Sequence, residues 1–104
     1  MITERLTFRA KYGQGDALYA LMKQNMNEMP PPASVVGARL YSDLTGQMFN
    51  VILEIDHADL DAYVSGTKTE MQEYGSKEFQ AWFAKMVAVT EVGERQLLNS
   101  EKLR

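Results

Sequence analysis

Residues 76–98 read SKEFQAWFAKMVAVTEVGERQLL, and this stretch decides the fold. In its first half, apolar side chains recur every three or four residues, which places them on one face of a helix; they are Phe79, Trp82, Phe83, Met86 and Val87. Ser76 can cap the first turn with its hydroxyl, and Glu78 adds negative charge where the helix dipole favours it. From Thr90 onward the residues favour a strand. Because an aromatic stripe of this size needs a surface to cover, the stretch predicts a helix packed on a β-sheet and followed by a strand.

Three further segments alternate apolar and polar residues, which is the pattern of a strand with one buried face. They are residues 2–10, 35–42 and 47–55. The third segment has the clearest alternation, whereas Glu4 interrupts the apolar face of the first. In the second segment, the alternation assigns Val35 to the same face as Arg39. The last strand is expected over residues 90–99, with Gly93 as a candidate bulge.

Two more helical segments are predicted. In residues 16–29 the apolar side chains keep helical spacing, and the three prolines at 30–32 end the helix. The segment after the third strand opens with Asp56 and Asp59, three residues apart, as in an acidic variant of a capping box. Gly66 lies inside this helix and costs about 1 kcal/mol relative to alanine, so an irregularity is expected there. The inward face of the helix is expected to hold Leu60, Tyr63, Val64, Met71 and Tyr74.

Composition limits the classes of function. The chain has 104 residues and is expected to form a single domain over residues 1–104. Its formal net charge is −3 and no two basic residues are adjacent, which argues against a nucleic-acid surface. Cysteine is absent, so disulfides, thiolate metal sites and a cysteine nucleophile are excluded. No apolar run approaches the roughly 20 residues that span a bilayer, so we expect a cytoplasmic protein without membrane contact.

His57 is the only histidine, which excludes a metal site built from several histidines of one chain. Because it lies between Asp56 and Asp59 at the start of a helix, it is expected on the surface. A general base or a haem ligand is the alternative. No metal and no cofactor are predicted.

The order of the elements is strand, helix, strand, strand, helix, helix, strand, with the second helix split at Gly75-Ser76. This order predicts an α+β fold of the ferredoxin-like type, a βαββ(αα)β sandwich in which helices cover one face of an antiparallel four-stranded sheet. The expected strand order is 4-1-3-2, with the first and third strands at the centre.

The second face of this sheet is expected to mix apolar and charged side chains: Arg5, Thr7, Arg9, Val35, Arg39, Tyr41, Met48, Asn50, Ile52 and Glu54. A face in full contact with water does not need so many apolar residues, and a face inside one chain does not tolerate so many charges. A partly wet interface between two copies accepts both. We therefore predict a homodimer through this face, with a solvated face that carries scattered apolar residues as the alternative.

The helix and strand quoted above resemble those of a known superfamily. FQAWFAK at residues 79–85, which leads into EVGERQLL at residues 91–98, is similar to the NIPSNAP-type proteins of the dimeric α/β-barrel superfamily. The resemblance implies a homodimer whose two sheets pack face to face as a barrel. Members of the wider superfamily include cofactor-free monooxygenases of antibiotic biosynthesis, haem-degrading monooxygenases, isomerases and proteins with no assigned activity. The haem-degrading members pair a histidine ligand with an asparagine and a tryptophan, and the first strand here offers Thr7 in place of the asparagine, so haem is not expected.

Four residues are candidates for ligand binding: Asn50, Trp82, Tyr41 and Arg39. Asn50 lies in mid-strand between apolar neighbours, and a buried amide needs partners, so it could orient a ligand or bond across the dimer. Arg39 and Tyr41 share its face and could bind an acidic or phenolic ligand, whereas an ion pair of Arg39 with Glu54 is the alternative. Trp82 could form the wall of a pocket between helices and sheet, or belong to the core.

Two functions follow from these residues. The first is a small dimeric protein that binds an apolar or aromatic metabolite between helices and sheet. The second is a cofactor-free monooxygenase of the antibiotic-biosynthesis type acting on a phenolic substrate, which needs an open pocket where Asn50, Trp82 or a tyrosine converge. A purely structural interaction module is a third alternative. The dinucleotide fingerprint, the phosphate loop and the Gly-x-Ser-x-Gly motif are absent, so no catalytic motif decides between them.

Overall fold

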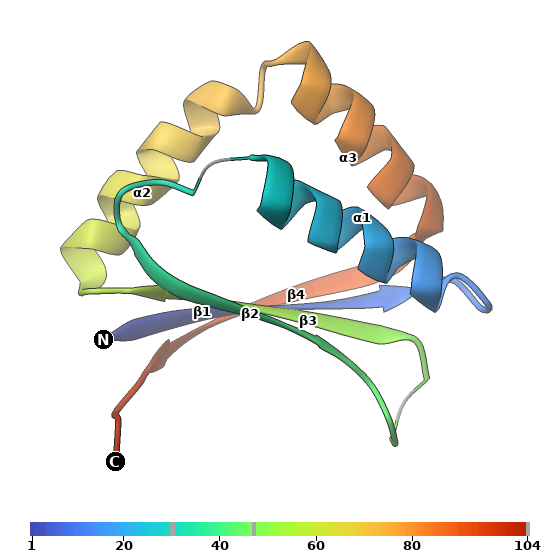
Figure 1. The fold of residues 1–104 in the computed structure, drawn as a ribbon, viewed down its shortest axis with the longest axis horizontal. Helices are drawn as coiled ribbons and strands as arrows, with labels where there is room; N and C mark the ends of the chain where they lie inside the picture. The colour runs from blue at the N-terminus through green and yellow to red at the C-terminus, as the bar shows by residue number, and fades with distance from the viewer. Residues whose placement is uncertain (30, 47, 104) are drawn as a thin grey trace.

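A four-stranded antiparallel sheet carries three helices on one face in the part of the chain that the structure describes (Figure 1). This computed structural model describes residues 1–29, 31–46 and 48–103. The elements are β1 (Ile2–Ala10), α1 (Gly15–Glu28), β2 (Val35–Ser42), β3 (Asn50–His57), α2 (Leu60–Glu73), α3 (Lys77–Val89) and β4 (Thr90–Asn99). The α+β, ferredoxin-like prediction is confirmed. Pro30, expected to help end the first helix, and Gln47, expected to begin the third strand, lie outside the described residues.

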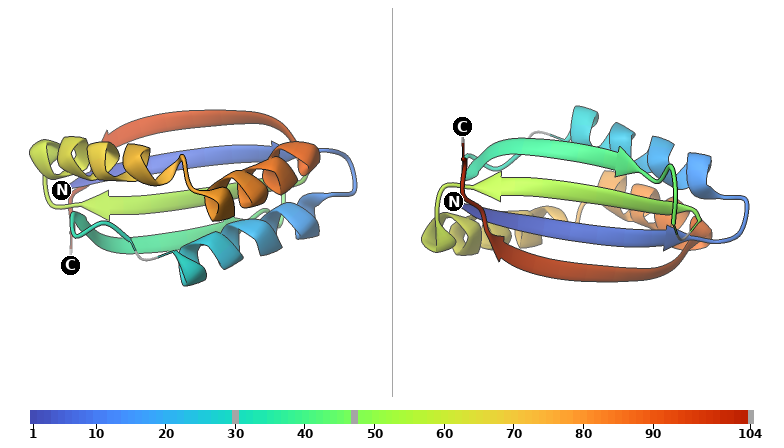
Figure 2. Two further views of the ribbon diagram at one scale, coloured as in Figure 1. Left: turned by 90° about the horizontal axis from the view of Figure 1, so that it is seen from above. Right: turned by 90° about the horizontal axis from the view of Figure 1, so that it is seen from below.

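The strands follow the order β2-β3-β1-β4, and each neighbouring pair is antiparallel. This is the expected order, with the first and third strands at the centre. Figure 2 shows the helices above one face of the sheet in its left view, and the opposite face without helices in its right view. We call the first the helix face and the second the open face. None of the helices in the described ranges is long and apolar enough to cross a membrane.

Side-chain caps fix where α2 and α3 begin. The Ser76 hydroxyl accepts a hydrogen bond from the Phe79 backbone N–H at 3.1 Å, as the sequence predicts. The Asp59 carboxylate accepts one from the Ala62 N–H at 2.8 Å and caps α2. Asp56 does not take part in this cap, so the expected capping box is wrong. Asp56 lies within β3, and its carboxylate belongs to the open face.

A bulge in β2 changes the face of one predicted residue. Val35 pairs with His57 and Gly37 pairs with Asp56, so Val36 is an extra residue in β2. The insertion shifts the alternation by one position at the start of the strand. Val35 therefore packs against the core on the helix face, and the prediction that it lies on the open face is wrong.

The core lies between α1, α3 and the central strands. It consists of Ala10, Leu18, Met22, Val51, Leu53, Ile55 and Met86. The region under α2 is filled less completely, because Leu60, Val64 and Met71 are exposed. The prediction that these three point inward is wrong, whereas Tyr63 and Thr67, which were expected on the same face, do line the space between α2 and the sheet.

His57 and Gly66 show how closely α2 approaches the end of β3. His57 is only 3% exposed, so the expectation of a surface histidine is wrong, and its ring meets the Tyr63 ring edge-on with 5.2 Å between centroids. A Cβ atom at Gly66 would collide with the Ser34 hydroxyl and lie 3.7 Å from the His57 ring. Glycine therefore permits close packing here, and α2 runs through Gly66 without the expected interruption.

The expected bulge in β4 is displaced by two residues. The register shifts between Arg9, which pairs with Val92, and Ala10, which pairs with Thr90, so the extra residue is Glu91 and the expectation at Gly93 is wrong. Gly93 has a different role, because a Cβ atom there would approach the Phe8 ring to 2.9 Å.

Candidate functional site: a cavity between the helices and the sheet

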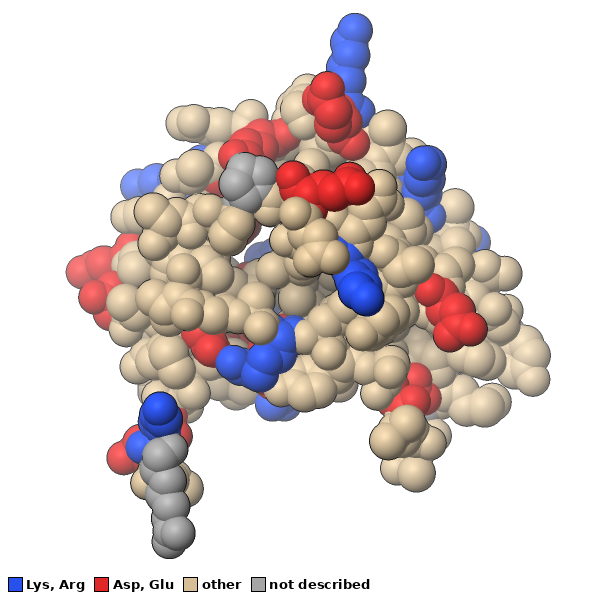
Figure 3. Space-filling model, viewed as in Figure 1, with Lys and Arg blue, Asp and Glu red and all other residues tan. Residues whose placement is uncertain are grey.

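A cavity of about 650 Å³ lies between the helix face of the sheet and the three helices. Figure 1 shows α2 and α3 meeting at an angle above the sheet, and the space lies beneath their junction. The space-filling view of Figure 3 shows the hollow near the centre of the molecule. All three helices and all four strands of the described part of the chain contribute to its lining, so the cavity depends on the whole fold.

One end of the cavity is aromatic. The ring of Phe79 stacks on Tyr74 with 4.7 Å between centroids and on Phe83 with 5.7 Å, and it lies tilted beside Trp82 at 5.7 Å. The Trp82 indole N–H donates a hydrogen bond of 2.8 Å to the backbone carbonyl of Leu21, which fastens α3 to α1. Trp82 packs against the core and also lines the cavity, so both interpretations of this residue describe part of its surroundings.

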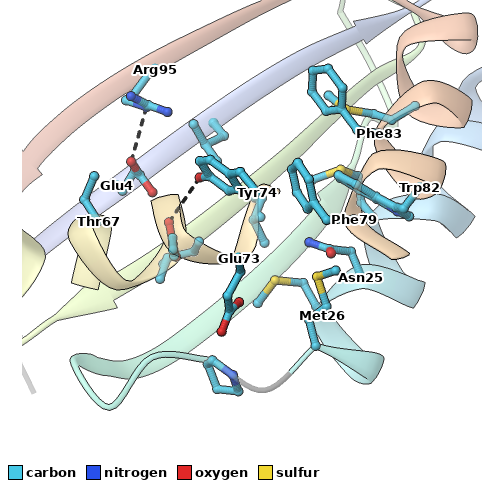
Figure 4. A pocket seen from close by; sticks show the side chains of 18 of the residues that line it. Glu4, Asn25, Met26, Thr67, Glu73, Tyr74, Phe79, Trp82, Phe83 and Arg95 are labelled. Carbon is cyan, nitrogen blue, oxygen red and sulfur yellow. Dashed lines mark hydrogen bonds and ion pairs between the residues drawn. The ribbon is translucent and has the colours of Figure 1, made fainter. Parts of the chain in front are cut away.

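The other end of the cavity is acidic (Figure 4). Glu4, the residue that interrupts the apolar face of β1, accepts a 3.0 Å hydrogen bond from the Tyr63 hydroxyl and pairs with the Arg95 guanidinium at 3.2 Å. The Glu70 carboxylate accepts a long hydrogen bond of 3.4 Å from the Tyr74 hydroxyl. Burial, and then the negative charge of Glu4, raise the pKa of Glu70 above its ordinary value.

The tyrosine hydroxyls respond to the same surroundings. Burial and the neighbouring Glu4 raise the pKa of Tyr63, and burial and the neighbouring Glu70 raise the pKa of Tyr74. Both hydroxyls therefore keep their protons at neutral pH and act as hydrogen-bond donors. No group of three or more histidine, aspartate or glutamate residues in the described ranges is arranged to hold a metal ion.

Asn25 is a cavity residue that the sequence reasoning missed. Its side chain extends from α1 toward the cavity in Figure 4, and its buried Oδ1 has no hydrogen-bond partner among the described residues. Such an acceptor costs free energy unless something donates to it. The signal was its position, because Asn25 lies three residues after Met22 and four after Leu21, on the apolar face of the helix.

Arg39 and Tyr41 lie on the open face, within an ion-pair network. The Arg39 guanidinium donates to Glu54 at 3.1 Å and to both carboxylate oxygens of Asp56 at 2.7 and 2.9 Å. Glu54 also accepts from the Tyr41 hydroxyl at 2.9 Å and from Arg5 at 2.9 Å. The alternative interpretation of Arg39, an ion pair with Glu54, is therefore confirmed.

This network sets the ionisation of its members. Hydrogen bonds to Asp56 and then to Glu54 raise the pKa of Arg39. The hydrogen bond from Arg39 lowers the pKa of Asp56 against the effect of burial. Burial opposes ionisation of Glu54, but hydrogen bonds from Arg5, Tyr41 and Arg39 outweigh it and lower the pKa.

The four predicted ligand residues do not meet at one place. Trp82 lines the cavity. Asn50 begins β3 opposite Arg9 and shares the open face with Arg39 and Tyr41. The sheet therefore separates Trp82 from the other three.

Comparison with known proteins gives a likeness of structure. The sequence matches no protein-family profile and no curated protein. An uncharacterized NIPSNAP domain protein from Burkholderia xenovorans is similar with a TM-score of 0.77 and 15% identity, over 100% of this chain and 98% of that one. A NIPSNAP family protein from Agrobacterium tumefaciens has a TM-score of 0.76 and 17% identity, over 98% and 94%. SnoaB, a cofactor-independent oxygenase from Streptomyces nogalater, has a TM-score of 0.66 and 12% identity, over 97% of this chain and 93% of that one. At the level of the fold, the NIPSNAP-like resemblance is confirmed.

Proposed function

We propose that this protein is a homodimer that binds a small apolar or aromatic metabolite in the cavity between its helices and its sheet. The observation that carries the proposal is the cavity itself. Its volume of about 650 Å³ falls within the range of roughly 300–1,000 Å³ that ligand pockets occupy. Aromatic rings and methionines in its wall stay in contact with water, and a bound apolar molecule would remove that surface from water.

The lining has the composition of a ligand pocket. Apolar and aromatic side chains make most of the wall, and a few polar groups converge at one end. Those polar groups are the Glu4 and Glu70 carboxylates and the Tyr63 hydroxyl, while the Asn25 amide lies at the aromatic end (Figure 4). Such an arrangement orients a molecule whose body is apolar.

Dimerisation is proposed through the open face. The network of Arg5 and Arg39 with Glu54 and Asp56 balances two positive charges with two negative charges, so the face can approach a second copy without net repulsion. The Tyr41 ring is exposed beside this network and offers apolar contact. Light scattering at micromolar concentration tests the dimer. A monomer there would overturn this part of the proposal.

Binding can be tested with a neutral probe, 4-phenylbutan-1-ol. Trp82 is the only tryptophan and lines the cavity, so its fluorescence reports occupancy directly. We expect a saturable change in that fluorescence. The substitution Thr67→Phe places a ring inside the cavity and should weaken binding at least about tenfold, the equivalent of ~1.4 kcal/mol.

A matched control lies on the same helix. Thr67 and Thr69 both hydrogen-bond through their hydroxyls to the carbonyl four residues earlier, but Thr69 is exposed and outside the cavity. Thr69→Phe should therefore leave the affinity unchanged. Absence of binding to the native chain, or equal loss in both variants, contradicts the proposal.

The second candidate function is a cofactor-free monooxygenase of the antibiotic-biosynthesis type that acts on a phenolic substrate. The fold shared with a cofactor-independent oxygenase favours it, and the tyrosine hydroxyls of the cavity are the polar groups that would orient a phenol, while Trp82, whose N–H is bonded to Leu21, would contribute its ring. Oxygen uptake by the native chain with a panel of phenols tests this function. Binding of a phenol without uptake above that of buffer would leave only the binding role.

A further inference from the structure

The charges around the cavity are unequal. Four carboxylates line it, those of Glu4, Glu70, Glu73 and Glu94, whereas Arg95 is the cation among the lining residues that the structure describes. Arg95 is already paired with Glu4, and its side chain is 61% exposed at the edge of the sheet. The acidic end therefore presents an excess of negative charge to anything that enters.

Of the two lining carboxylates that are not exposed, Glu4 and Glu70, the second has the weaker compensation. In the described part of the chain, its one hydrogen bond is the 3.4 Å contact from Tyr74, a residue of the same helix segment. Its charged neighbours include Glu4 and Glu73, and burial together with Glu4 raises its pKa. A carboxylate held in this way gains more from a positive charge than one that already has a partner.

The surrounding groups suit a cation with an apolar body. The Tyr74 and Phe79 rings are stacked beside Glu70 and present π-faces, which attract an ammonium group within about 6 Å. An anionic head group would instead meet an excess of carboxylates.

We infer that the cavity takes a hydrophobic cation, a molecule with an apolar or aromatic body and a protonated amine. The amine lies between Glu4 and Glu70 beside the Tyr74 ring, and the body lies against Phe79 and Trp82. This inference rests on the proposed function, since it names the class of ligand for the same cavity.

The test uses three probes that share one body and differ in the charge of the head group: 4-phenylbutylamine, 4-phenylbutan-1-ol and 4-phenylbutanoate. Each is titrated into the native chain at neutral pH while Trp82 fluorescence is followed. We expect the amine to bind at least about tenfold more tightly than the alcohol, and the carboxylate to bind most weakly. Raising the salt concentration should weaken binding of the amine and leave binding of the alcohol unaffected.

Substitution locates the charge responsible. Glu70→Gln keeps the size of the side chain and should bring the affinity for the amine within about threefold of that for the alcohol, both measured in the same variant. Glu101→Gln removes an exposed carboxylate of the C-terminal segment and should preserve the preference. If circular dichroism shows that Glu70→Gln does not fold, the salt dependence of amine binding to the native chain tests the cationic ligand in its place.

The outcomes separate the two proposals. Equal affinities for the three probes, or tighter binding of the carboxylate, overturn the cationic ligand and leave cavity binding intact. Binding of none of the probes overturns both. Preference for the amine that Glu70→Gln abolishes supports both.

Discussion

Replacing Arg39 with methionine removes the centre of the ion-pair network on the open face and leaves its carboxylates in place. Asp56 is 5% exposed and would keep only the Thr3 hydroxyl, which donates to it at 2.7 Å. Glu54 would keep Arg5 and Tyr41. The substitution therefore affects Asp56 most, because a buried charge loses its counter-ion while the length of the apolar stem is preserved.

The magnitude follows from the geometry. Arg39 makes three charge-assisted hydrogen bonds, at 3.1, 2.7 and 2.9 Å, and bonds of this kind contribute roughly 1.5–3 kcal/mol each when fully buried. The Arg39 side chain is 44% exposed, so water replaces part of what is lost. We expect the free energy of unfolding to fall by about 2 kcal/mol at neutral pH. For a chain of this length, that is a decrease in Tm of about 10 °C.

The effect has a defined pH dependence. The pKa values of Glu54 and Asp56 are lowered in the folded protein, so the stabilisation is complete above the ordinary carboxyl values of about 4 and is lost as the pH falls through the folded values. Urea unfolding followed by circular dichroism, at neutral pH and at about pH 3, should show the difference between native protein and variant shrinking in acid.

The matched control is Arg9→Met. Arg9 approaches Glu91 only to 3.9 Å and both side chains are exposed, so this substitution should cost less than about 0.5 kcal/mol. Measurements at two protein concentrations separate the loss within one chain from any loss of dimer. Equal effects of the two substitutions, or a difference for Arg39→Met that persists undiminished in acid, would refute the reasoning.

Three further outcomes can be measured by the same unfolding experiment. Gly66→Ala should destabilise the chain by roughly 1–3 kcal/mol because the added Cβ collides with Ser34. Gly75→Ala is the control, and it should be neutral within about 0.5 kcal/mol because the space around Gly75 is open. Stabilisation by Gly66→Ala would contradict the close approach of α2. Glu70→Gln should raise stability at neutral pH and lose that advantage as the pH falls below the raised pKa of Glu70, because the folded state disfavours its ionised form; an advantage independent of pH would point to another cause. Trp82→Phe should cost about 1–3 kcal/mol through the lost hydrogen bond to α1 and lost packing, and a neutral result would show that this bond does not fasten the helices.

The architecture could be predicted because its signals are local. The Ser76 cap, the aromatic spacing after it and the period of two in the strands each depend on a few neighbouring residues. The bulge at Val36 could not be predicted in this way, because it exists only in the register of β2 against β3. That register also decides on which face Val35 lies.

The sequence predicts the location of the candidate site better than it predicts which residues line it. Alternation puts apolar side chains under the helices, and Trp82 follows from helical spacing. Glu4 was visible as a carboxylate at an inward position, but its partners Tyr63 and Arg95 come from α2 and β4, which are distant in sequence. The burial of His57 likewise depends on the approach of α2.

Substitution of Gly93 offers a way to change the volume of the cavity. The Phe8 ring rests over it, both residues border the cavity, and any added side chain at this position would press the ring inward. A graded series such as Gly93→Ala and Gly93→Val would reduce the volume of the cavity stepwise from β4. Such substitutions in β4 could change the selectivity for shorter or longer ligands and leave Glu4, Glu70 and Tyr74, the residues proposed to surround the amine, unaltered.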